Sequence, residues 1–373
     1  MSSVTEPRES QSRRAFHSLT VKRVTRLTRD AVAVSFAVPA ELRERFRFTA
    51  GQFLSLQAEI EGEQIRRSYS ICAAPQDDDL RVAIKRVADG RFSRWAHDAL
   101  VPGTTVAVAP PDGRFFVPLS REHSKHYLGF AAGSGITPLL AIVKTTLAVE
   151  PASRFTLVYG NRATSSVMFR EELQDLKDRY LERLALLFVM SREPQDVELF
   201  SGRIDRAKCD ALFERWIDLP SVDETFICGP EAMTAEVSAT LADRDFPRGR
   251  IKTELFAAGP RSARTRAMVP AVEREPAQCA ARAIVDGQLR TFSIEMGKET
   301  VLDAGLRQGI DLPYSCKGGV CSTCRVMLTE GEVEMDVHYA LEDYEIARGF
   351  ILMCQSYPVT ATLAIDVDSH SHV

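Results

Sequence analysis

The sequence predicts a multidomain α+β and α/β protein with three parts: an antiparallel β-barrel, a doubly wound parallel α/β domain and a β-grasp domain. Three observations lead to this fold class. Six short β-branched or alternating runs occupy the first 109 residues. Strand-like and helical stretches then alternate. Near the C-terminus, four cysteines in a C-x4-C-x2-C…C spacing stand among further strand-like runs.

Length and composition are those of an ordinary globular protein. The chain has 373 residues, enough for two or three domains, and 45% of them are hydrophobic. The longest apolar runs, such as 184–190, are far too short to cross a bilayer, and the polar stretch 1–14 lacks the apolar core of a signal peptide. We therefore expect a cytoplasmic protein with a disordered tail over 1–14 and no membrane association.

Charge is distributed unevenly. Residues 279–373 carry 7 Lys and Arg against 14 Asp and Glu, a net charge of −7, and the rest of the chain carries 40 against 37, or +3. An acidic module joined to a mildly basic body suits electrostatic steering between redox partners. The alternative is that the acidic residues only solvate a small domain. No basic run indicates nucleic-acid binding.

The first part of the chain predicts a closed antiparallel barrel. A short helical pattern, Phe92 to Leu100, interrupts its strands. Turn residues separate six strand-like runs, which are Leu19–Val24, Val32–Val38, Phe53–Glu59, Arg67–Cys72, Leu80–Val87 and Thr105–Ala109.

The pattern changes after Pro118 to an alternation typical of a parallel doubly wound sheet. The strand-like runs are Tyr127–Ala132, Phe155–Tyr159, Leu184–Met190 and Thr225–Cys228. The helical runs are Pro138–Val149, Met168–Tyr180, Arg206–Trp216 and Glu231–Ala242. In such a sheet the ligand binds at the carboxyl ends of the strands.

The cysteine spacing predicts a [2Fe–2S] cluster. Cys316, Cys321 and Cys324 have four and then two residues between them, and 29 residues separate Cys324 from Cys354. Small residues that let backbone amides approach sulfur stand in the same loop: Gly318, Gly319 and Ser322. A zinc site would pair two C-x2-C knuckles, and a disulfide framework suits short secreted chains. We therefore predict that the four cysteines are the metal ligands.

A second motif, Arg66-Arg67-Ser68-Tyr69-Ser70, lies in the predicted barrel. Its R-x-Y-S pattern resembles the flavin signature of the ferredoxin–NADP⁺ reductase superfamily. A tyrosine ring can lie against the isoalloxazine, an arginine fork suits a phosphate, and a serine hydroxyl can bond near flavin N5. The helix that opens at Gly90 could hold a flavin pyrophosphate. The FAD-binding residues that we predict are Arg67, Ser68, Tyr69, Ser70, Lys85, Gly90, Arg91, Phe92, Ser93 and Phe256.

Nucleotide-binding motifs follow the strands of the predicted parallel sheet. Gly133-Ser134-Gly135-Ile136-Thr137-Pro138 opens the first helix in the G-x-G-x-x-P form that is usual in this superfamily. Two further strands end in Tyr159-Gly160-Asn161-Arg162 and in Ser191-Arg192. We expect no acidic residue there to bind a ribose 2′-hydroxyl, and two arginines with a serine suit a 2′-phosphate, which favours NADPH.

The Cys228-Gly229-Pro230 motif ends the fourth strand and completes the predicted nucleotide site. In the superfamily this cysteine lies beside the nicotinamide as hydride passes to flavin, so the resemblance implies catalytic roles for Cys228 and Ser70. The alternative is a buried thiol that acts as a small hydrophobe. We expect the cysteines without partners at useful spacing, Cys72, Cys209 and Cys279, to be structural.

These motifs define the expected domain order. After the tail come an FAD-binding barrel (15–118), an NADP-binding domain (119–257), a proline-containing linker (258–278) and a [2Fe–2S] ferredoxin domain (279–373). The last of these has a helix expected near Val301–Gln308 and strands near Arg325–Leu328 and Ala361–Val367.

The residues of the motifs and their order along the chain resemble those of one family in particular, the reductase subunits of phenylacetyl-CoA epoxidases. Segments 16–21, 28–32, 129–138 and 312–324 carry this resemblance. It implies electron flow from NADPH through FAD and [2Fe–2S] to a separate di-iron oxygenase. The chain has no Glu-x-x-His pair on a predicted helix, so we expect it to lack the di-iron site itself. Two alternatives stay open: a reductase that serves a ring-hydroxylating or steroid oxygenase, and a flavin/iron–sulfur redox sensor.

Overall fold

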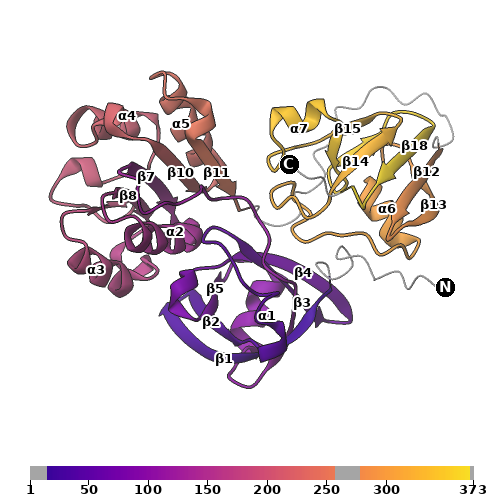
Figure 1. Ribbon diagram of the computed structural model, residues 1–373, viewed down its shortest axis with the longest axis horizontal. Helices are drawn as coiled ribbons and strands as arrows, with labels where there is room; N and C mark the ends of the chain where they lie inside the picture. The colour runs from indigo at the N-terminus through magenta and orange to yellow at the C-terminus, as the bar shows by residue number, and fades with distance from the viewer. Residues whose placement is uncertain (1–14, 257–277, 370–373) are drawn as a thin grey trace. The chain divides into compact units, whose positions relative to one another are not determined.

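The structure is a computed structural model that describes residues 15–256 and 278–369. Most of 17–256 forms one compact unit and 278–369 forms another (Figure 1). The predicted tail 1–14 lies outside the described residues, and so does the predicted linker 258–278 apart from Gln278.

The first unit begins with a six-stranded antiparallel sheet in the order β4-β3-β6-β1-β2-β5. Ile71, directly after β4, forms a bridge with Val82 of β5, so the two outer strands meet and the sheet closes into a barrel. The strands are β1 (His17–Thr28), β2 (Ala31–Ala37), β3 (Phe53–Ile60), β4 (Glu63–Ser70), β5 (Leu80–Lys85) and β6 (Thr105–Val108), and helix α1 spans Arg91–Ala99.

Strand β4 is longer than predicted, because it begins at Glu63 and not at Arg67. A two-residue turn, Glu61-Gly62, joins it to β3, and both turn residues have positive φ, 56° and 78°. Such a turn matches the twist of a hairpin, so pairing continues to its edge. The missed segment, Glu63-Gln64-Ile65-Arg66, is polar in three of four positions and gives little strand signal.

A five-stranded parallel sheet in the order β11-β10-β7-β8-β9 completes the first unit. Its strands are β7 (His126–Ala132), β8 (Arg154–Asn161), β9 (Leu184–Met190), β10 (Glu224–Gly229) and β11 (Ile251–Leu255). Its helices are α2 (Ile136–Val149), α3 (Arg170–Arg179), α4 (Arg206–Arg215) and α5 (Glu231–Ala242). The order reverses between β7 and β10, so the ligand crevice is expected at their carboxyl ends.

Strand β11 was not among the predicted strands. Only five residues long, it contains a lysine and a glutamate, and its position at the edge of the sheet leaves its side chains half-buried or exposed. A short strand of this composition lacks the apolar run by which the other four were recognised.

Barrel and parallel sheet share a hydrophobic core. All residues of β2 except the last are buried. Val32, Val34 and Phe36 pack inside the barrel, whereas Ala31 and Ala33 belong to the cluster that contains α2 and the parallel sheet. Because side chains alternate along a strand, one strand can serve two cores. This packing makes the two layers one unit.

The second unit has a mixed sheet in the order β13-β12-β18-β14-β16, in which β12 and β18 are parallel. Helix α6 packs its buried residues Val301, Leu302 and Ala304 into the core of this unit. This is the expected β-grasp arrangement. Its other elements are β12 (Gln278–Val285), β13 (Gln288–Glu295), α6 (Val301–Arg307), β14 (Arg325–Glu330), β15 (Val333–Met335), α7 (Asp343–Ala347), β16 (Phe350–Leu352), β17 (Ser356–Pro358) and β18 (Thr362–Asp366).

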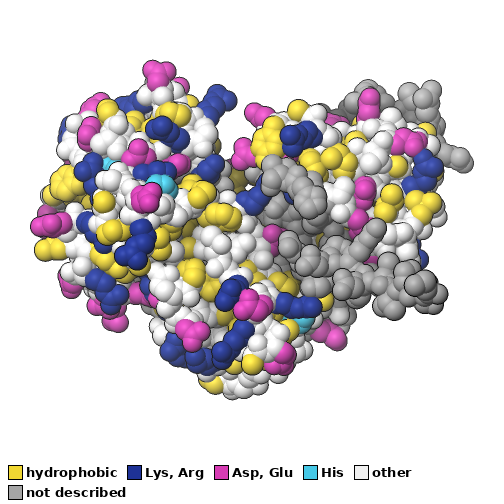
Figure 2. All heavy atoms as spheres, in the orientation of Figure 1, with side chains coloured by type: hydrophobic (Ala, Val, Ile, Leu, Met, Phe, Trp, Pro, Cys, Tyr) yellow, Lys and Arg dark blue, Asp and Glu magenta, His cyan; other side chains and the backbone are white. Residues whose placement is uncertain are grey.

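Two surface properties complete the description. On the face of the first unit drawn in Figure 2, basic and acidic side chains are interspersed, so neither sign dominates that face. Across the described ranges, no helix is both long and apolar enough to cross a membrane.

Candidate functional site

The end of β4 carries the predicted flavin motif. Ser70 is buried, and its hydroxyl donates a hydrogen bond to Glu254 Oε2 at 2.9 Å. The ring of Tyr69 lies 5.8 Å from that of Phe92. Arg67 donates to the carbonyl of Arg66 at 2.7 Å. Ser68 is half-buried on the same strand.

The start of α1 contains a second group of predicted flavin residues, from Gly90 to Ser93. A Cβ at Gly90 would lie 2.2 Å from Val87 Cγ2, so only glycine fits, and no side chain caps the helix. Its first amide groups are therefore open to an anion. Phe92 and Ser93 are buried in the barrel, where Ser93 Oγ donates to the carbonyl of Gly90 at 3.1 Å. These two side chains shape the turn from inside.

Arg91 has strong protein partners in this structure. Its guanidinium forms ion pairs with Glu63 at 2.5 Å and Glu61 at 3.2 Å, and donates to the carbonyl of Ile60. The side chain thus ties α1 to the β3–β4 hairpin. A role in FAD binding would require Arg91 to leave or share these partners.

Lys85 links the barrel to the nucleotide turn. Its Nζ is 3.8 Å from Asp30 Oδ2, and a Cβ built at Gly133 would lie 3.7 Å from that Nζ. One lysine therefore stands beside the turn that begins the parallel domain, where it can neutralise phosphate charge. The structure brings this predicted flavin residue and the predicted NADP turn together.

The turn after β7 has the backbone freedom that a nucleotide site needs. Gly133 has φ of 55°, and a Cβ at Gly135 would lie 2.0 Å from the carbonyl oxygen of Cys228. The carboxyl ends of β7 and β10 thus approach so closely that only glycine fits between them. Tyr159 donates to the carbonyl of Gly133 at 2.9 Å and Thr137 to that of Ser134 at 3.0 Å. The turn is supported by three buried residues at the start of α2, which are Ile136, Thr137 and Pro138.

The ends of β8 and β9 place the two predicted arginines side by side. The amide of Arg192 donates to the carbonyl of Arg162 at 2.8 Å, and both residues are exposed. Ser191 is bonded in the same way to Asn161. A Cβ built at Gly160 would lie 2.9 Å from Ile204 Cδ1 and 3.6 Å from the carbonyl oxygen of Ala131, so the strand end is closely packed.

An acidic residue does stand at these strand ends, contrary to the sequence-based expectation. Glu193 follows Arg192 directly. Its carboxylate accepts hydrogen bonds from the amide of Thr164 at 2.8 Å and from its hydroxyl at 2.6 Å, and these bonds lower the pKa of Glu193. The carboxylate of Glu193 is thus already hydrogen-bonded to the loop after β8.

Three distant segments meet at the carboxyl end of β10. Cys228 is fully buried and pairs in register with Glu254 of β11, which in turn accepts the hydrogen bond from Ser70. Burial, and then the charge of Glu254, raise the pKa of the Cys228 thiol well above its usual value, so the thiol is neutral at physiological pH. Gly229 and Pro230 lead from this point into α5, and Phe256 packs on the shared core.

Glu254 is a functional candidate that sequence patterns alone did not identify. Of the residues at the end of the predicted NADP-binding domain, only Phe256 was assigned a role from the sequence. The available signal was an acidic residue at the end of the domain's last strand, which is weak by itself. Its position opposite both Cys228 and Ser70 depends on strand pairing that local sequence does not reveal.

The four predicted cluster cysteines lie in two hydrogen-bonded pairs. A hydrogen bond with Cys321 lowers the pKa of Cys316 to about 7, and a hydrogen bond with Cys324 lowers the pKa of Cys354. Backbone amides also approach sulfur: Gly318 N is 3.3 Å from Cys316 Sγ. Lys317, Gly319 and Ser322 have positive φ, which lets the loop curl around its cysteines.

This pairing distinguishes two kinds of metal site. A tetrahedral zinc site would gather four ligands around one point. Two thiol pairs instead fit two irons, each with two protein ligands, as in a [2Fe–2S] cluster.

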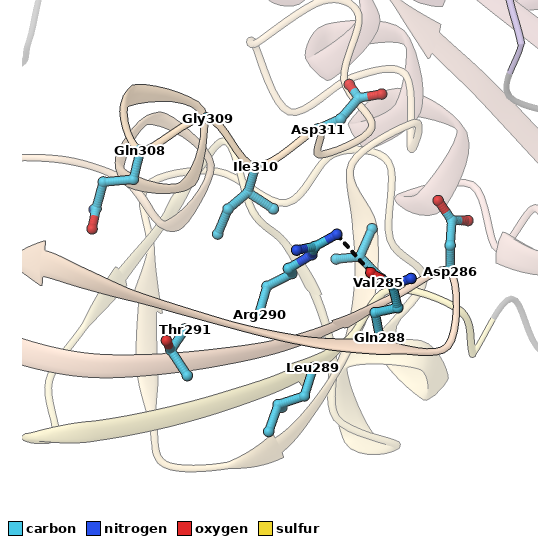
Figure 3. Close-up of a pocket in the computed structure, with 10 residues that line it drawn as sticks. All are labelled: Val285, Asp286, Gln288, Leu289, Arg290, Thr291, Gln308, Gly309, Ile310 and Asp311. Carbon is cyan, nitrogen blue, oxygen red and sulfur yellow. Dashed lines mark hydrogen bonds between the residues drawn. The ribbon is translucent and has the colours of Figure 1, made fainter.

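The second unit also has a hollow of about 650 Å³ (Figure 3). It lies between the β12–β13 hairpin and the residues after α6, and Arg290 bonds to Gln288 on one side of it at 2.6 Å. Leu289, which lines it, is largely exposed. None of its lining residues belongs to the predicted cofactor sites, so this hollow and those sites are separate.

Comparison with known proteins supports all three parts. Residues 18–117 match the oxidoreductase FAD-binding domain, 130–239 the oxidoreductase NAD-binding domain, and 283–359 the 2Fe-2S iron-sulfur cluster binding domain. The three matches follow the order of the motifs along the chain.

Relatives align over nearly the whole chain. It is 44% identical over 355 residues to a component of the 1,2-phenylacetyl-CoA epoxidase of Escherichia coli (strain K12), covering 95% of this chain and 98% of that one. It is 36% identical to the ferredoxin reductase component of 3-ketosteroid-9-alpha-monooxygenase from Rhodococcus rhodochrous, with 93% and 96% covered. The solved structure of phthalate dioxygenase reductase superposes with a TM-score of 0.59 at 24% identity, over 94% of this chain and 98% of that chain, and supports the fold alone.

Proposed function

We propose that this chain, which belongs to the family of oxygenase reductases with FAD-binding, NAD-binding and 2Fe-2S domains, carries electrons from NADPH through FAD and [2Fe–2S] to a separate di-iron oxygenase. The family makes it an NAD(P)H-dependent oxidoreductase that acts as a reductase component. The observation that carries the proposal is the convergence of Ser70, Cys228 and Glu254 at the carboxyl end of β10.

The residues of the first unit have distinct tasks in this proposal. A bound flavin accepts a hydride, which brings two electrons, and releases electrons singly to an iron–sulfur cluster. Ser70 would offer its hydroxyl at the edge of a bound flavin, and Glu254, which accepts the Ser70 hydrogen bond, would orient that hydroxyl and, when protonated, could supply a proton to the reduced flavin through it. Arg67, Tyr69 and Lys85 are the groups we assign to the phosphates and ring of FAD.

The nucleotide is held at the carboxyl ends of the parallel strands. We assign its pyrophosphate to the Gly133–Gly135 turn and its nicotinamide to the side of the sheet where Cys228 lies. A neutral thiol there packs against the ring without reacting as a nucleophile. Arg162 and Arg192 offer two exposed guanidinium groups for a 2′-phosphate, which favours NADPH.

The [2Fe–2S] cluster is assigned to Cys316, Cys321, Cys324 and Cys354. The four thiols fit a [2Fe–2S] cluster, because they form two pairs and because backbone amides already approach sulfur. All eight cysteines are free of disulfides. Thiols that serve as ligands require a reducing compartment, so we place the protein in the cytoplasm.

The acceptor that we propose is the di-iron oxygenase that epoxidises phenylacetyl-CoA, within a multicomponent complex. The name of the Escherichia coli relative supports this choice, and its identity of 44% exceeds the 36% of the steroid-system relative. A reductase for a steroid or ring-hydroxylating oxygenase is the second candidate, on the strength of that Rhodococcus relative.

A reconstitution separates the two candidates. The purified protein should contain one flavin, two irons and two labile sulfides per chain, in keeping with a binuclear cluster. Mixed with NADPH and either the remaining phenylacetyl-CoA epoxidase components or a 3-ketosteroid oxygenase component, it should support product formation only with the former. Turnover only with the steroid system would establish the second candidate, and zinc in place of iron would refute both.

A further inference from the structure

A buried ion pair stands next to the proposed cluster ligands. Arg325 directly follows Cys324 and begins β14, and Glu345 lies in α7. The guanidinium of Arg325 donates through Nη1 to Glu345 Oε1. The Glu345 side chain is 1% exposed and that of Arg325 is 17% exposed.

Each member of the pair has a further partner that fixes it. The second carboxylate oxygen of Glu345 accepts a hydrogen bond from the amide of Glu342 at 3.0 Å and so caps the start of α7. The guanidinium of Arg325 lies over the ring of Phe350, 4.9 Å from its centroid. Neither side chain is therefore free to turn toward solvent.

The pair also connects β14, which directly follows Cys324, to α7, which precedes β16 and Cys354 in the chain. Arg325 is opposite Leu352 in the β14–β16 ladder, and the amide of Met353 donates to the carbonyl of Cys324 at 3.1 Å. Cys354 comes next along the chain, and its thiol is hydrogen-bonded to that of Cys324. The pair is thus held at a fixed place in the fold, with Arg325 next in the chain to one member of this thiol pair.

Stability alone is a weak reason for such a pair. Removing two charges from water costs several kcal/mol, and a well-packed apolar pair of similar volume is often as stable or more so. A buried charge next to a redox centre has another consequence. Its field is little screened by salt, so it acts on the charge that the centre gains upon reduction.

We propose that Arg325 and Glu345 are positioning residues that set the reduction potential of the cluster. Arg325 raises this potential, and Glu345 lowers it. Reduction adds a negative charge, which the guanidinium stabilises and the carboxylate opposes. The inference rests on the proposed cluster ligands. Because the pair is neutral as a whole, the potential depends on the balance between its two members.

The test is a redox titration of the full-length protein followed by the electron paramagnetic resonance signal of the reduced cluster. Glu345→Gln, which keeps the side-chain shape, should raise the potential. Arg325→Gln should lower it. Each change should alter the one-electron reduction equilibrium at least threefold, which is about 28 mV. Glu345→Gln combined with Arg325→Gln should return close to the wild-type value, and Arg325→Lys should stay close to it.

A matched control is available in the same unit. Arg282 and Glu330 form an ion pair whose side chains are 52% and 47% exposed. Glu330 is at the far end of β14 from Arg325, roughly 16 Å along the strand. Arg282→Gln and Glu330→Gln should leave the potential unchanged.

Three outcomes would overturn the inference. Shifts of the same sign in both charge variants would mean that the pair only maintains the fold. An unmoved potential with an intact cluster signal would remove the inference but leave the proposed function standing. A wild type without a binuclear cluster signal would remove both. If Arg325→Gln fails to hold a cluster, Glu345→Gln and Arg325→Lys still test the inference. Glu345→Gln should move the potential, and Arg325→Lys should not.

Discussion

The hydroxyl of Ser70 donates a hydrogen bond of 2.9 Å to Glu254, although the two residues are 184 positions apart in the chain. Ser70 ends β4 of the barrel, and Glu254 lies in β11 at the edge of the parallel sheet. The bond therefore connects the proposed flavin layer to the proposed nucleotide layer. Since Glu254 is also in register with Cys228, one carboxylate stands between the two residues expected at the hydride-transfer site.

The first prediction concerns this carboxylate. Ser70→Ala removes a hydrogen bond to a charged group, worth about 1.5–3 kcal/mol, so the rate of flavin reduction by NADPH should fall roughly tenfold to a hundredfold. Glu254→Gln should cause a comparable loss, because the neutral amide accepts the Ser70 hydrogen bond more weakly than the carboxylate and cannot supply a proton. Stopped-flow absorbance of the flavin measures both rates.

Glu224 provides the control for this prediction. It lies at the opposite, amino end of β10 and pairs with Lys125 at 3.7 Å. Glu224→Gln should reduce flavin at the wild-type rate. An equal loss in Glu224→Gln and Glu254→Gln would point to the sheet as a whole and would contradict a local role of Glu254.

Residues such as Glu254 mark the limit of what local sequence predicts. The cluster loop was recognisable because all but one of its cysteines lie within nine residues, and the nucleotide turn because its glycines follow a buried strand. The fold class and the cofactors were predicted in this way and are confirmed. The contact between Ser70 and Glu254 instead depends on how barrel and sheet pack, through residues as small as Ala31 and Ala33.

The second prediction separates the two units. Cys324→Ser removes a proposed ligand of the cluster, so electron transfer to a one-electron acceptor protein such as cytochrome c should be abolished. Reduction of the flavin by NADPH should continue, because Ser70, Cys228 and Glu254 are untouched. Flavin absorbance and cytochrome reduction can be followed in the same preparation. A folded variant that has lost flavin reduction would show that the units do not work separately.

The third prediction concerns the ion pairs between barrel and parallel sheet. Glu172 of α3 binds Arg81 of β5 at 2.8 Å and Lys144 of α2 at 2.8 Å, and Lys144 also binds Asp77 of the barrel at 2.6 Å. Glu172→Gln would leave two partly buried cations facing each other, and should lower the free energy of unfolding by about 1–3 kcal/mol. Urea denaturation measures this change.

An exposed ion pair serves for comparison. Arg206 and Asp243 are 2.6 Å apart, with side chains 51% and 54% exposed. Asp243→Asn should change stability by less than about 0.5 kcal/mol, as is usual for surface pairs. Similar changes in the free energy of unfolding in Asp243→Asn and Glu172→Gln would show that the Glu172 ion pairs do not join the barrel to the parallel sheet more strongly than a surface pair does.

The fourth prediction is a dependence of stability on pH. Burial, followed by the charge of Arg154, lowers the pKa of His126 to about 4. Both ring nitrogens are engaged, with Ser221 and Thr156, each at 2.9 Å. The unfolded chain binds a proton at its ordinary pKa of 6.5, so the free energy of unfolding should fall as the pH drops from about 6.5 to about 4.

His126→Gln tests this dependence. Between pH 7.5 and pH 5 the wild type should lose about 2 kcal/mol more than the variant does. The chain has two tryptophans, so in a Trp95→Phe background the fluorescence of Trp216, at the end of α4, reports on the parallel domain alone. Parallel pH curves for wild type and variant would exclude His126 as the source.

The last prediction concerns the choice of nucleotide. Arg162 and Arg192 are exposed on neighbouring strand ends, and Glu193, which follows Arg192, is bonded to Thr164. A charge-assisted contact to a 2′-phosphate contributes about 1.5–3 kcal/mol. Since about 1.4 kcal/mol is a factor of ten, Arg162→Ala or Arg192→Ala should weaken NADPH roughly tenfold to a hundredfold. The KM for NADH, which lacks the phosphate, should hardly change.

Steady-state flavin reduction with both nucleotides decides the matter in Arg162→Ala, Arg192→Ala and the double variant. Arg215→Ala, in the last turn of α4, is the control and should leave both KM values unaltered. Equal losses with NADPH and NADH would place the two arginines at the pyrophosphate or in the fold. A wild type that prefers NADH would contradict the assignment more directly, because the pair of guanidinium groups would then face a ribose with no charge for them to bind. Increased NADPH use in Glu193→Gln would then reveal that the carboxylate held by Thr164, and not the arginines alone, sets the preference.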